Sequence, residues 1–366
     1  MDVLFLLAVV GLYFTVNYLL ACAALLMPFS MKPGKFKRLP KVSIIIAAMN
    51  EETIIENTLK NLRRVDYPDY ETIVVCQGND NTAKIAGKYA RVIHDKKTGK
   101  WHALQLGVKA AKGEIIYFLD ADTLPDKDSI KKIVSYMGKY EVSTGVTIPE
   151  GSTPTAMVFR LEGAFNNSLQ LILSCFLGTG FVQGKNYAIY KKTLKRVGGF
   201  KKAPLEDINL TFRLFAKKIK VAVVDAKCRE QATPKLGWYI KQHKRWELGK
   251  YKEFGWLSKH NKVGIFTKLF AIPSGLAIYH TPMFSFLLLI TYLYTGGVFL
   301  LCGSALGLAV QIITAARFLR PADLLAIPLT FTALAVSQAY FILYMLSMRL
   351  TGVNELWGRT DKAAKN

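Results

Sequence analysis

Residues 114–123 read Glu-Ile-Ile-Tyr-Phe-Leu-Asp-Ala-Asp-Thr, a continuous apolar run that ends in two carboxylates, Asp120 and Asp122. The run is rich in β-branched and aromatic side chains, which is typical of an interior strand of a parallel sheet. Ligands of open α/β sheets bind at the carboxyl ends of the strands. The stretch therefore predicts a buried strand that places two carboxylates at the mouth of a cleft.

The spacing of the two carboxylates suits one hard cation. Residues two apart in a strand face the same side, so Asp120 and Asp122 are able to converge on a metal ion. Magnesium takes one or two protein carboxylates beside phosphate and water oxygens, and manganese fits the same donors. The pair therefore indicates a Mg²⁺ or Mn²⁺ site. The competing interpretation is an Asp-rich turn that closes the strand, since Asp is common in turns.

Composition limits the classes of partner and of metal site. The chain has 366 residues, of which 51% are hydrophobic, and a formal net charge of +23. A basic chain with long uncharged apolar runs favours membrane lipids and a phosphorylated substrate as partners over nucleic acid. The five cysteines are scattered and form no Cys-x-x-Cys pair, which argues against a disulfide framework and a zinc site.

Apolar runs at both ends predict a multi-pass protein of the cell membrane. Residues 1–30 contain an uncharged apolar run of the roughly 20 residues needed to cross a bilayer. The basic linker at residues 31–40 places the following domain in the cytoplasm. Residues 278–348 predict a C-terminal transmembrane region of two or three spans, and residues 349–366 a polar tail. Because the tail is basic and prefers the cytoplasm, the number of spans stays open.

Residues 41–250 have the pattern of a separate α/β domain. Short apolar runs alternate with longer amphipathic segments, which predicts βαβ units around a parallel sheet. The expected elements are strands at 42–48, 71–76, 92–94 and 114–120, with helices from 54 and over 99–111. An amphipathic helix over 154–177 packs on the sheet or lies on the membrane. Residues 251–277 suit the lipid headgroup zone.

Seven short motifs follow one another within this domain. They are Asn50-Glu51, Asp80-Asn81-Thr82, Gly99-Lys100, Asp120-Ala121-Asp122, Gly184-Lys185-Asn186, Leu205-Glu206-Asp207 and Gln242-His243-Lys244-Arg245-Trp246. In order and spacing they resemble the membrane-embedded family 2 glycosyltransferases, which include cellulose, chitin and hyaluronan synthases and ceramide glucosyltransferase. The resemblance covers residues 41–249. It implies a GT-A fold, with a Rossmann-like, mixed but mainly parallel sheet in the cytoplasm and transmembrane helices on both sides.

The resemblance also implies a nucleoside-diphosphate sugar as the donor. The diphosphate gains negative charge as the sugar leaves, and a divalent cation on Asp120 and Asp122 stabilises that charge. On the Gln242 helix, Arg245 is able to fork onto diphosphate oxygens. The expected residues of the nucleotide-sugar site are Asn50, Glu51, Gln77, Asp80, Lys100, Asp120, Gln242 and Arg245.

The acceptor hydroxyl must lose a proton as it attacks, which requires a positioned carboxylate. Asp207 is the predicted base, and its competing role is to cap the helix that follows it. One base without a second carboxylate for a covalent intermediate favours a single displacement that inverts the anomeric carbon. Glu206, Lys185 and Trp246 are expected on the acceptor side. The alternatives are a surface role for Lys185 and a lipid-interface position for Trp246.

The donor base and the acceptor stay open. Where the family carries acidic residues at the end of the second strand, this chain has Cys76 and Gln77, so uridine competes with guanosine (UDP or GDP). The acceptor is a lipid-linked or polysaccharide hydroxyl. A processive synthase that secretes its product is one alternative. A non-catalytic nucleotide-sugar-binding membrane protein or transporter is another, disfavoured because the metal pair and the base are present and no span holds a buried charge.

Overall fold

The computed structural model describes residues 31–96, 99–232, 235–259, 318–326, 329–330 and 333. The apolar runs at 1–30 and 278–316, residues 260–277 and the tail at 349–366 lie outside these described residues, as does most of 324–348. Within the described part of the chain, no helix has the length and apolarity that a membrane crossing requires.

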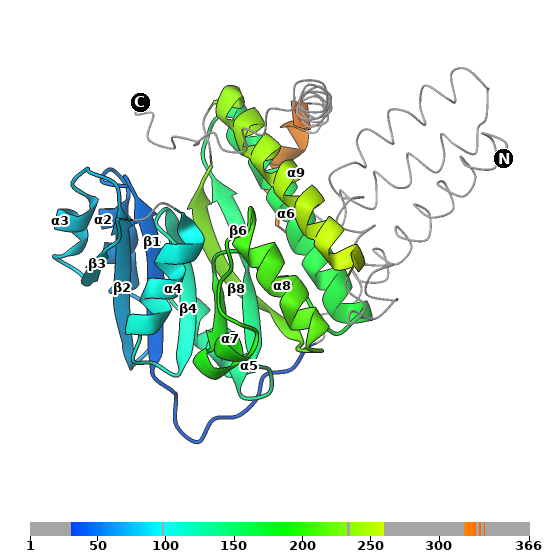
Figure 1. The fold of residues 1–366 in the computed structure, drawn as a ribbon. Helices are drawn as coiled ribbons and strands as arrows, with labels where there is room; N and C mark the ends of the chain where they lie inside the picture. The colour runs from blue at the N-terminus through cyan, green and yellow to red at the C-terminus, as the bar shows by residue number, and fades with distance from the viewer. Residues whose placement is uncertain are drawn as a thin grey trace, which may run out of the picture.

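A mixed eight-stranded sheet, with the strand order β3-β2-β1-β4-β7-β6-β8-β5, forms the centre of the fold (Figure 1). Strands β1 to β4 run parallel, β7 is antiparallel to both β4 and β6, β8 is parallel to β6, and β5 is antiparallel to β8. The strands are β1 (Val42–Met49), β2 (Tyr70–Gln77), β3 (Arg91–His94), β4 (Ile115–Asp120), β5 (Thr123–Pro125), β6 (Val142–Glu150), β7 (Tyr187–Tyr190) and β8 (Val221–Gln231). The predicted mixed, mainly parallel sheet is confirmed.

Helices cover both faces of the sheet. Helices α2 (Ile55–Leu62) and α5 (Ser129–Met137) contribute to the core on one face, and α4 (Lys100–Ala110), α7 (Lys191–Arg196) and α8 (Glu206–Ala216) to the core on the other. Helices α6 (Pro154–Phe176) and α9 (Leu236–Lys259) lie side by side over the β6 and β8 half of the sheet (Figure 1). The short α3 (Thr82–Ala86) follows β2, and the 3₁₀ turn η1 spans Pro321–Ala326.

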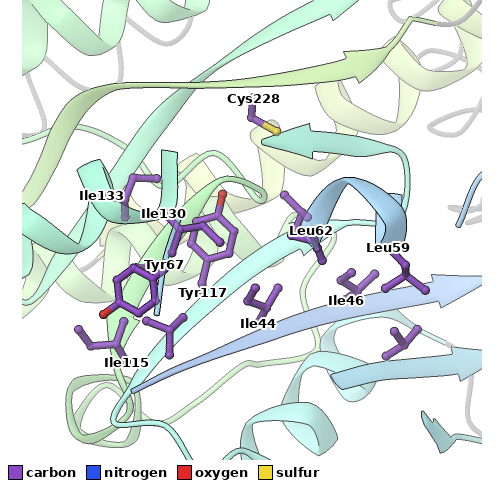
Figure 2. Close-up of a cluster of buried hydrophobic side chains, with 14 of the residues drawn as sticks. Ile44, Ile46, Leu59, Leu62, Tyr67, Ile115, Tyr117, Ile130, Ile133 and Cys228 are labelled. Carbon is purple, nitrogen blue, oxygen red and sulfur yellow. The ribbon is translucent and has the colours of Figure 1, made fainter. Parts of the chain in front are cut away.

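Strand β4 lies between the two cores. Its side chains from Ile115 to Leu119 are at most 1% exposed. Because alternate side chains of a strand point to opposite faces, Tyr117 packs in one core and Phe118 in the other. Figure 2 shows Tyr117 and Ile115 in one cluster with Ile44 and Ile46 of β1 and Leu62 of α2. The predicted buried strand is confirmed.

The register of the parallel strands brings their carboxyl ends to one edge of the sheet. Met49 of β1 pairs with Gln77 of β2, and Ala47 of β1 pairs with Asp120 of β4. The polar residues that follow β1, β2 and β4 therefore share this edge. We call it the carboxyl edge.

Helix α6 packs on the sheet, as one of the two interpretations of residues 154–177 predicts. The Asn167 side chain donates from Nδ2 to the Thr147 carbonyl of β6 at 2.9 Å. A Cβ atom at Gly163 would lie 2.8 Å from Pro149, so the helix and the strand are in close contact. The buried Arg160 of α6 pairs with Asp323 of η1 at 2.8 Å, which attaches this turn to the domain.

We predict that Gly107→Ala destabilises the protein, because a Cβ there would lie 2.5 Å from Ile45 Cγ2 in the buried contact between α4 and β1. Overpacking costs about 1–3 kcal/mol and outweighs the helix-propensity gain of about 1 kcal/mol. Gly237→Ala in α9 is the matched control, since nothing lies within 4 Å of its added Cβ. Urea unfolding should show a loss of stability for Gly107→Ala and a small gain for Gly237→Ala. The opposite order would contradict the packing.

Candidate active site

An ion cluster occupies the carboxyl edge where β4 ends. Lys100 Nζ, at the start of α4, lies 2.8 Å from Asp120 Oδ1 and 3.0 Å from Glu206 Oε1 at the start of α8. Burial lowers the pKa of Lys100, but the carboxylates of Asp120 and Glu206 outweigh burial and raise it above its usual range. Lys100 is therefore a fixed positive charge that joins the end of β4 to α8.

The predicted base, Asp207, lies beside this cluster. Burial, reinforced by the neighbouring Glu206 carboxylate and opposed by Lys100, raises the pKa of Asp207 to about 7. Its Oδ1 accepts a hydrogen bond from the Ile208 backbone N–H at 2.8 Å. A Cβ at Gly184 would lie 2.7 Å from Asp207 Oδ2, and the φ angle of Gly184 is +61°, which favours glycine. The loop at 184–186 thus lies directly against the Asp207 carboxylate.

Asn186 has a structural role in this loop. Its Oδ1 accepts from the Tyr117 hydroxyl at 2.7 Å, and its Nδ2 donates to the carbonyls of Val146 at 3.1 Å and Ala226 at 2.8 Å. One fully buried amide therefore joins β4, β6 and β8 next to the site. Lys185, expected on the acceptor side, forms an ion pair with Glu230 of β8.

The carboxylates of Asp120 and Asp122 lie on a well-supported turn between β4 and β5. Thr123 donates from its hydroxyl to the Asp120 carbonyl at 2.7 Å, and Thr58 of α2 donates to the Ala121 carbonyl at 2.7 Å. Both contacts use backbone carbonyls and do not engage the two carboxylates, so these residues are able to form a turn and also hold a metal.

The described residues contain no cluster of three or more Asp, Glu, His or Cys side chains fit to hold a metal. Two carboxylates completed by phosphate and water oxygens are the donor set of Mg²⁺ or Mn²⁺. The Asp120 carboxylate already contacts the Lys100 ammonium group, so its position suits the binding of a positive charge.

A pocket of ≈ 510 Å³ opens at the carboxyl ends of β1, β2 and β3. It brings together three of the predicted nucleotide-site residues, Asn50, Gln77 and Asp80. Asn50 adopts a φ angle of +54°, and its Oδ1 accepts from the Asn79 N–H at 3.2 Å. Glu51 does not line the pocket, and its backbone N–H donates to the Thr82 hydroxyl at 2.7 Å.

Asp95 is a pocket residue that our sequence reasoning missed. It follows β3 and lines the same pocket, and its Oδ2 lies 2.7 Å from Gln77 Nε2 and 2.8 Å from His102 Nδ1. The carboxylate that β2 lacks is therefore provided by the next strand. Its position in the sequence could have identified it. Asp95 directly follows the predicted strand 92–94, and the carboxyl ends of parallel strands lie at one edge of the sheet, where ligands bind.

Gln242, Arg245 and Trp246 lie on α9 where it packs against α6. Trp246 meets Phe159 of α6 edge to face, with ring centroids 6.5 Å apart. Gln242 Oε1 and Arg245 Nε are buried and have no hydrogen-bond partner among the described residues. Helix α9 reaches the ion cluster through α8, since a Cβ at Gly249 would lie 2.5 Å from Leu205, the residue before Glu206.

A pocket of ≈ 510 Å³, a carboxylate pair and a buried acid lie at one edge of an α/β sheet, the edge at which proteins of this fold class bind their ligands. A profile of the family described as "Glycosyltransferase like family 2" matches residues 40–249. The chain belongs to this family, as the motifs predicted.

Curated relatives are similar to part of the chain. The probable glycosyltransferase YdaM of Bacillus subtilis is 28% identical over 248 residues, which cover 58% of this chain and 56% of the relative. The beta-monoglucosyldiacylglycerol synthase of Nostoc sp. is 27% identical over 237 residues, with 59% and 50% covered. The poly-beta-1,6-N-acetyl-D-glucosamine synthase of Staphylococcus epidermidis is 35% identical over 96 residues, with 24% and 23% covered. The chain thus spans about half the length of the first two.

A solved structure has the same fold. The mannosyltransferase PcManGT from Pyrobaculum calidifontis, in complex with GDP-Man and Mn²⁺, superimposes with a TM-score of 0.64 and 20% identity. The match covers 96% of this chain and 98% of that one. At this identity it is evidence for the fold.

We predict that Asn186→Ala lowers the free energy of unfolding by about 3 kcal/mol, because it leaves two buried carbonyls without donors and places alanine at a positive φ. Tyr117→Phe is the matched control, since it removes one of the three hydrogen bonds and should cost about 1–2 kcal/mol. Denaturant unfolding measures both. An Asn186→Ala protein as stable as the parent would show that the amide does not join the strands.

Proposed function

We propose that the protein is an inverting, metal-dependent glycosyltransferase that moves a sugar from a nucleoside-diphosphate sugar to a hydroxyl of a lipid-linked or polysaccharide acceptor at the cytoplasmic face of a membrane. One observation carries this proposal. A buried acid with a pKa of about 7, Asp207, lies in the same charge cluster as Asp120, the predicted metal ligand.

In this proposal the nucleotide-sugar donor binds at the carboxyl edge. Gln77 and Asp95 line the pocket and would face the nucleobase, and Lys100 would give the diphosphate a fixed positive charge. A divalent cation on Asp120 and Asp122 would stabilise the leaving diphosphate when bound. Lys100 connects this donor side to α8, so the two halves of the site are held by one side chain.

The acceptor side centres on Asp207. With a pKa of about 7, roughly half of the carboxyl groups are ionised at neutral pH, which matches a general base to its task. The carboxylate takes the proton of the acceptor hydroxyl as its oxygen attacks the sugar. The neighbouring Glu206 is engaged by Lys100, so it is not placed as a second nucleophile. One base and no covalent intermediate give inversion.

The acceptor class rests on the chain's own apolar runs and on its relatives. One relative is named for a glycolipid product and another for a polysaccharide, and a lipid acceptor requires lateral access from a bilayer. Residues 1–30 and 278–348 would provide the membrane segments. A processive synthase and a non-catalytic nucleotide-sugar-binding protein or transporter are the competing functions.

A donor panel separates these functions. Full-length protein in lipid, given UDP and GDP sugars with Mg²⁺ or Mn²⁺, should release nucleoside diphosphate and glycosylate a lipid extract in single additions. A polymeric product would identify a processive synthase. Tight nucleotide-sugar binding without any release would leave only the non-catalytic function.

We predict that Asp207→Asn lowers turnover at least about 100-fold, because it removes the general base. The kcat/KM of the parent should rise with pH through about 7, and Asp128→Asn, a change at a half-exposed carboxylate, should leave that profile intact. The raised pKa also makes the stability of the fold depend on pH, because the folded state favours protonated Asp207. The stability that this protonated form contributes is fully present below the pKa of the unfolded state, about 4, and is lost as the pH rises through the pKa of the folded state, about 7. Asp207→Asn should therefore raise Tm at pH 8 and change it little at pH 4. Full turnover in this variant would remove Asp207 as the base.

We also predict that Asp95→Asn weakens the binding of UDP or GDP about tenfold or more, since a carboxylate accepts the imide N–H of uracil or guanine more strongly than an amide does. CDP, whose base has no ring N–H donor, serves as the matched ligand and should bind both proteins alike. Calorimetric titration measures the three affinities. An equal loss for all three nucleotides would indicate damage to the pocket rather than lost base recognition.

A further inference from the structure

A second cavity, of ≈ 750 Å³, lies between α4 and α7 at the other end of β4. It is lined by residues 112–114, which precede β4, whereas Asp120 is the last residue of that strand. Six residues of extended chain separate the two positions by roughly 20 Å. The cavity is therefore distinct from the carboxyl edge and from the nucleotide pocket.

The lining of this cavity is strongly basic. Five of its fourteen residues are lysines and only one, Glu114, is acidic. In the whole chain, Lys and Arg together make up 49 of 366 residues, so the cavity holds nearly three times the average share. The five are Lys109, Lys112, Lys191, Lys192 and Lys195.

Four of these ammonium groups have no carboxylate within 4.0 Å among the described residues, and Glu141 acts on Lys192 only from beyond that distance. No ion pair within 4.0 Å involves Lys109, Lys112, Lys192 or Lys195. All four are exposed at the cavity. Lys191 differs, because it is half-buried and donates to the Ala111 carbonyl at 2.7 Å, which ties α7 to the end of α4.

The walls between the lysines strengthen the effect of their charges. Leu106, Val108 and Leu194 line the cavity, and Leu194 is 1% exposed. A concave surface with low-dielectric walls and charges of one sign focuses the electric field and concentrates counter-ions. Like charges grouped in this way repel one another, and a bound anion offsets that repulsion.

We propose that this lysine cavity binds a multiply charged phosphate group. Lysine binds phosphate as a point charge and needs no fixed bidentate geometry, which suits ammonium groups that come from α4, from the segment after it and from α7. The volume exceeds what one carboxylate fills, and the charge of four lysines exceeds what one carboxylate balances. The phosphate belongs either to a soluble phosphorylated molecule or to a phospholipid headgroup.

Site-resolved lysine labelling tests the proposal. Full-length protein is acylated with a lysine-specific reagent, with and without inorganic pyrophosphate, in EDTA so that no metal links the anion to Asp120 or Asp122. Mass spectrometry should show labelling of the four cavity lysines slowed several-fold, and labelling of Lys84 and Lys88 unchanged. Both control lysines are exposed and lie outside the cavity. Equal slowing everywhere would overturn the proposal.

A pair of charge-matched variants provides the second measurement. Replacing the four cavity lysines by glutamine should weaken pyrophosphate binding about tenfold or more, since it removes four positive charges from the lining. Replacing Lys84, Lys88, Lys202 and Lys217 by glutamine removes the same net charge outside the cavity and should leave binding unchanged. Equal losses in the two variants would contradict a built site.

A third arm identifies the source of the phosphate. The labelling is repeated with vesicles that contain phosphatidylglycerol and with vesicles of phosphatidylcholine alone. Protection by phosphatidylglycerol vesicles but not by pyrophosphate assigns the cavity to a lipid headgroup, and the reverse assigns it to a soluble ligand. Protection by neither pyrophosphate nor anionic vesicles overturns the proposal.

Discussion

The burial of β4 on both faces requires helices on both sides of the sheet, and these helices decide where the charged residues of the site are placed. Five apolar side chains, from Ile115 to Leu119, are removed from water, which contributes on the order of 10 kcal/mol. This burial is possible only if α2 and α5 cover one face and α4, α7 and α8 the other. Asp120 follows directly and so stands at the boundary between core and solvent.

The same packing places the charged groups around Asp120. Helices α4 and α8 begin at the carboxyl edge, so their first residues, Lys100 and Glu206, meet the end of β4. Lys100 then balances Asp120 and Glu206 together, while Asp207 is left buried with its pKa raised. A strand end and two helix starts thus produce a fixed cation beside an acid that titrates near neutral pH. Lys100 thus stays protonated while Asp207 is able to gain or lose a proton near pH 7. Such a difference suits a site in which one group holds a negative charge and another accepts a proton.

The sequence predicts the local part of this arrangement well. Strands β1, β2 and β4 and helix α4 follow from hydrophobic periodicity. Each is a continuous segment, and the order of its own apolar and polar residues indicates which side chains are buried. The antiparallel insertion of β7 between β4 and β6 was not predicted, since pairing between distant segments leaves no periodic signal. The sheet-packing role of α6 needed the contacts of Asn167 and Gly163 to be decided.

For the candidate site, too, the sequence predicts the local features but not the contacts between distant segments. Asp120 and Asp207 were found from motif order, whereas Asp95 was missed because its partner, Gln77, comes from another strand. Lys185 was interpreted as an acceptor contact, and only the fold brings Glu230 of β8 against it. Asn186 belongs to one of the seven motifs, and its three hydrogen bonds show a buried amide that joins strands. In each case the missing information is a contact between residues far apart in the chain.

We propose above all that the end of β4 binds the donor diphosphate through a divalent cation. Anomalous diffraction from crystals of the protein grown with Mn²⁺ and a nucleoside diphosphate tests it most directly. We expect one manganese peak between the carboxylates of Asp120 and Asp122 and the diphosphate oxygens, with the base beside Gln77 and Asp95. A nucleotide bound in that pocket with no manganese at these aspartates, or manganese bound elsewhere with the diphosphate, would contradict it.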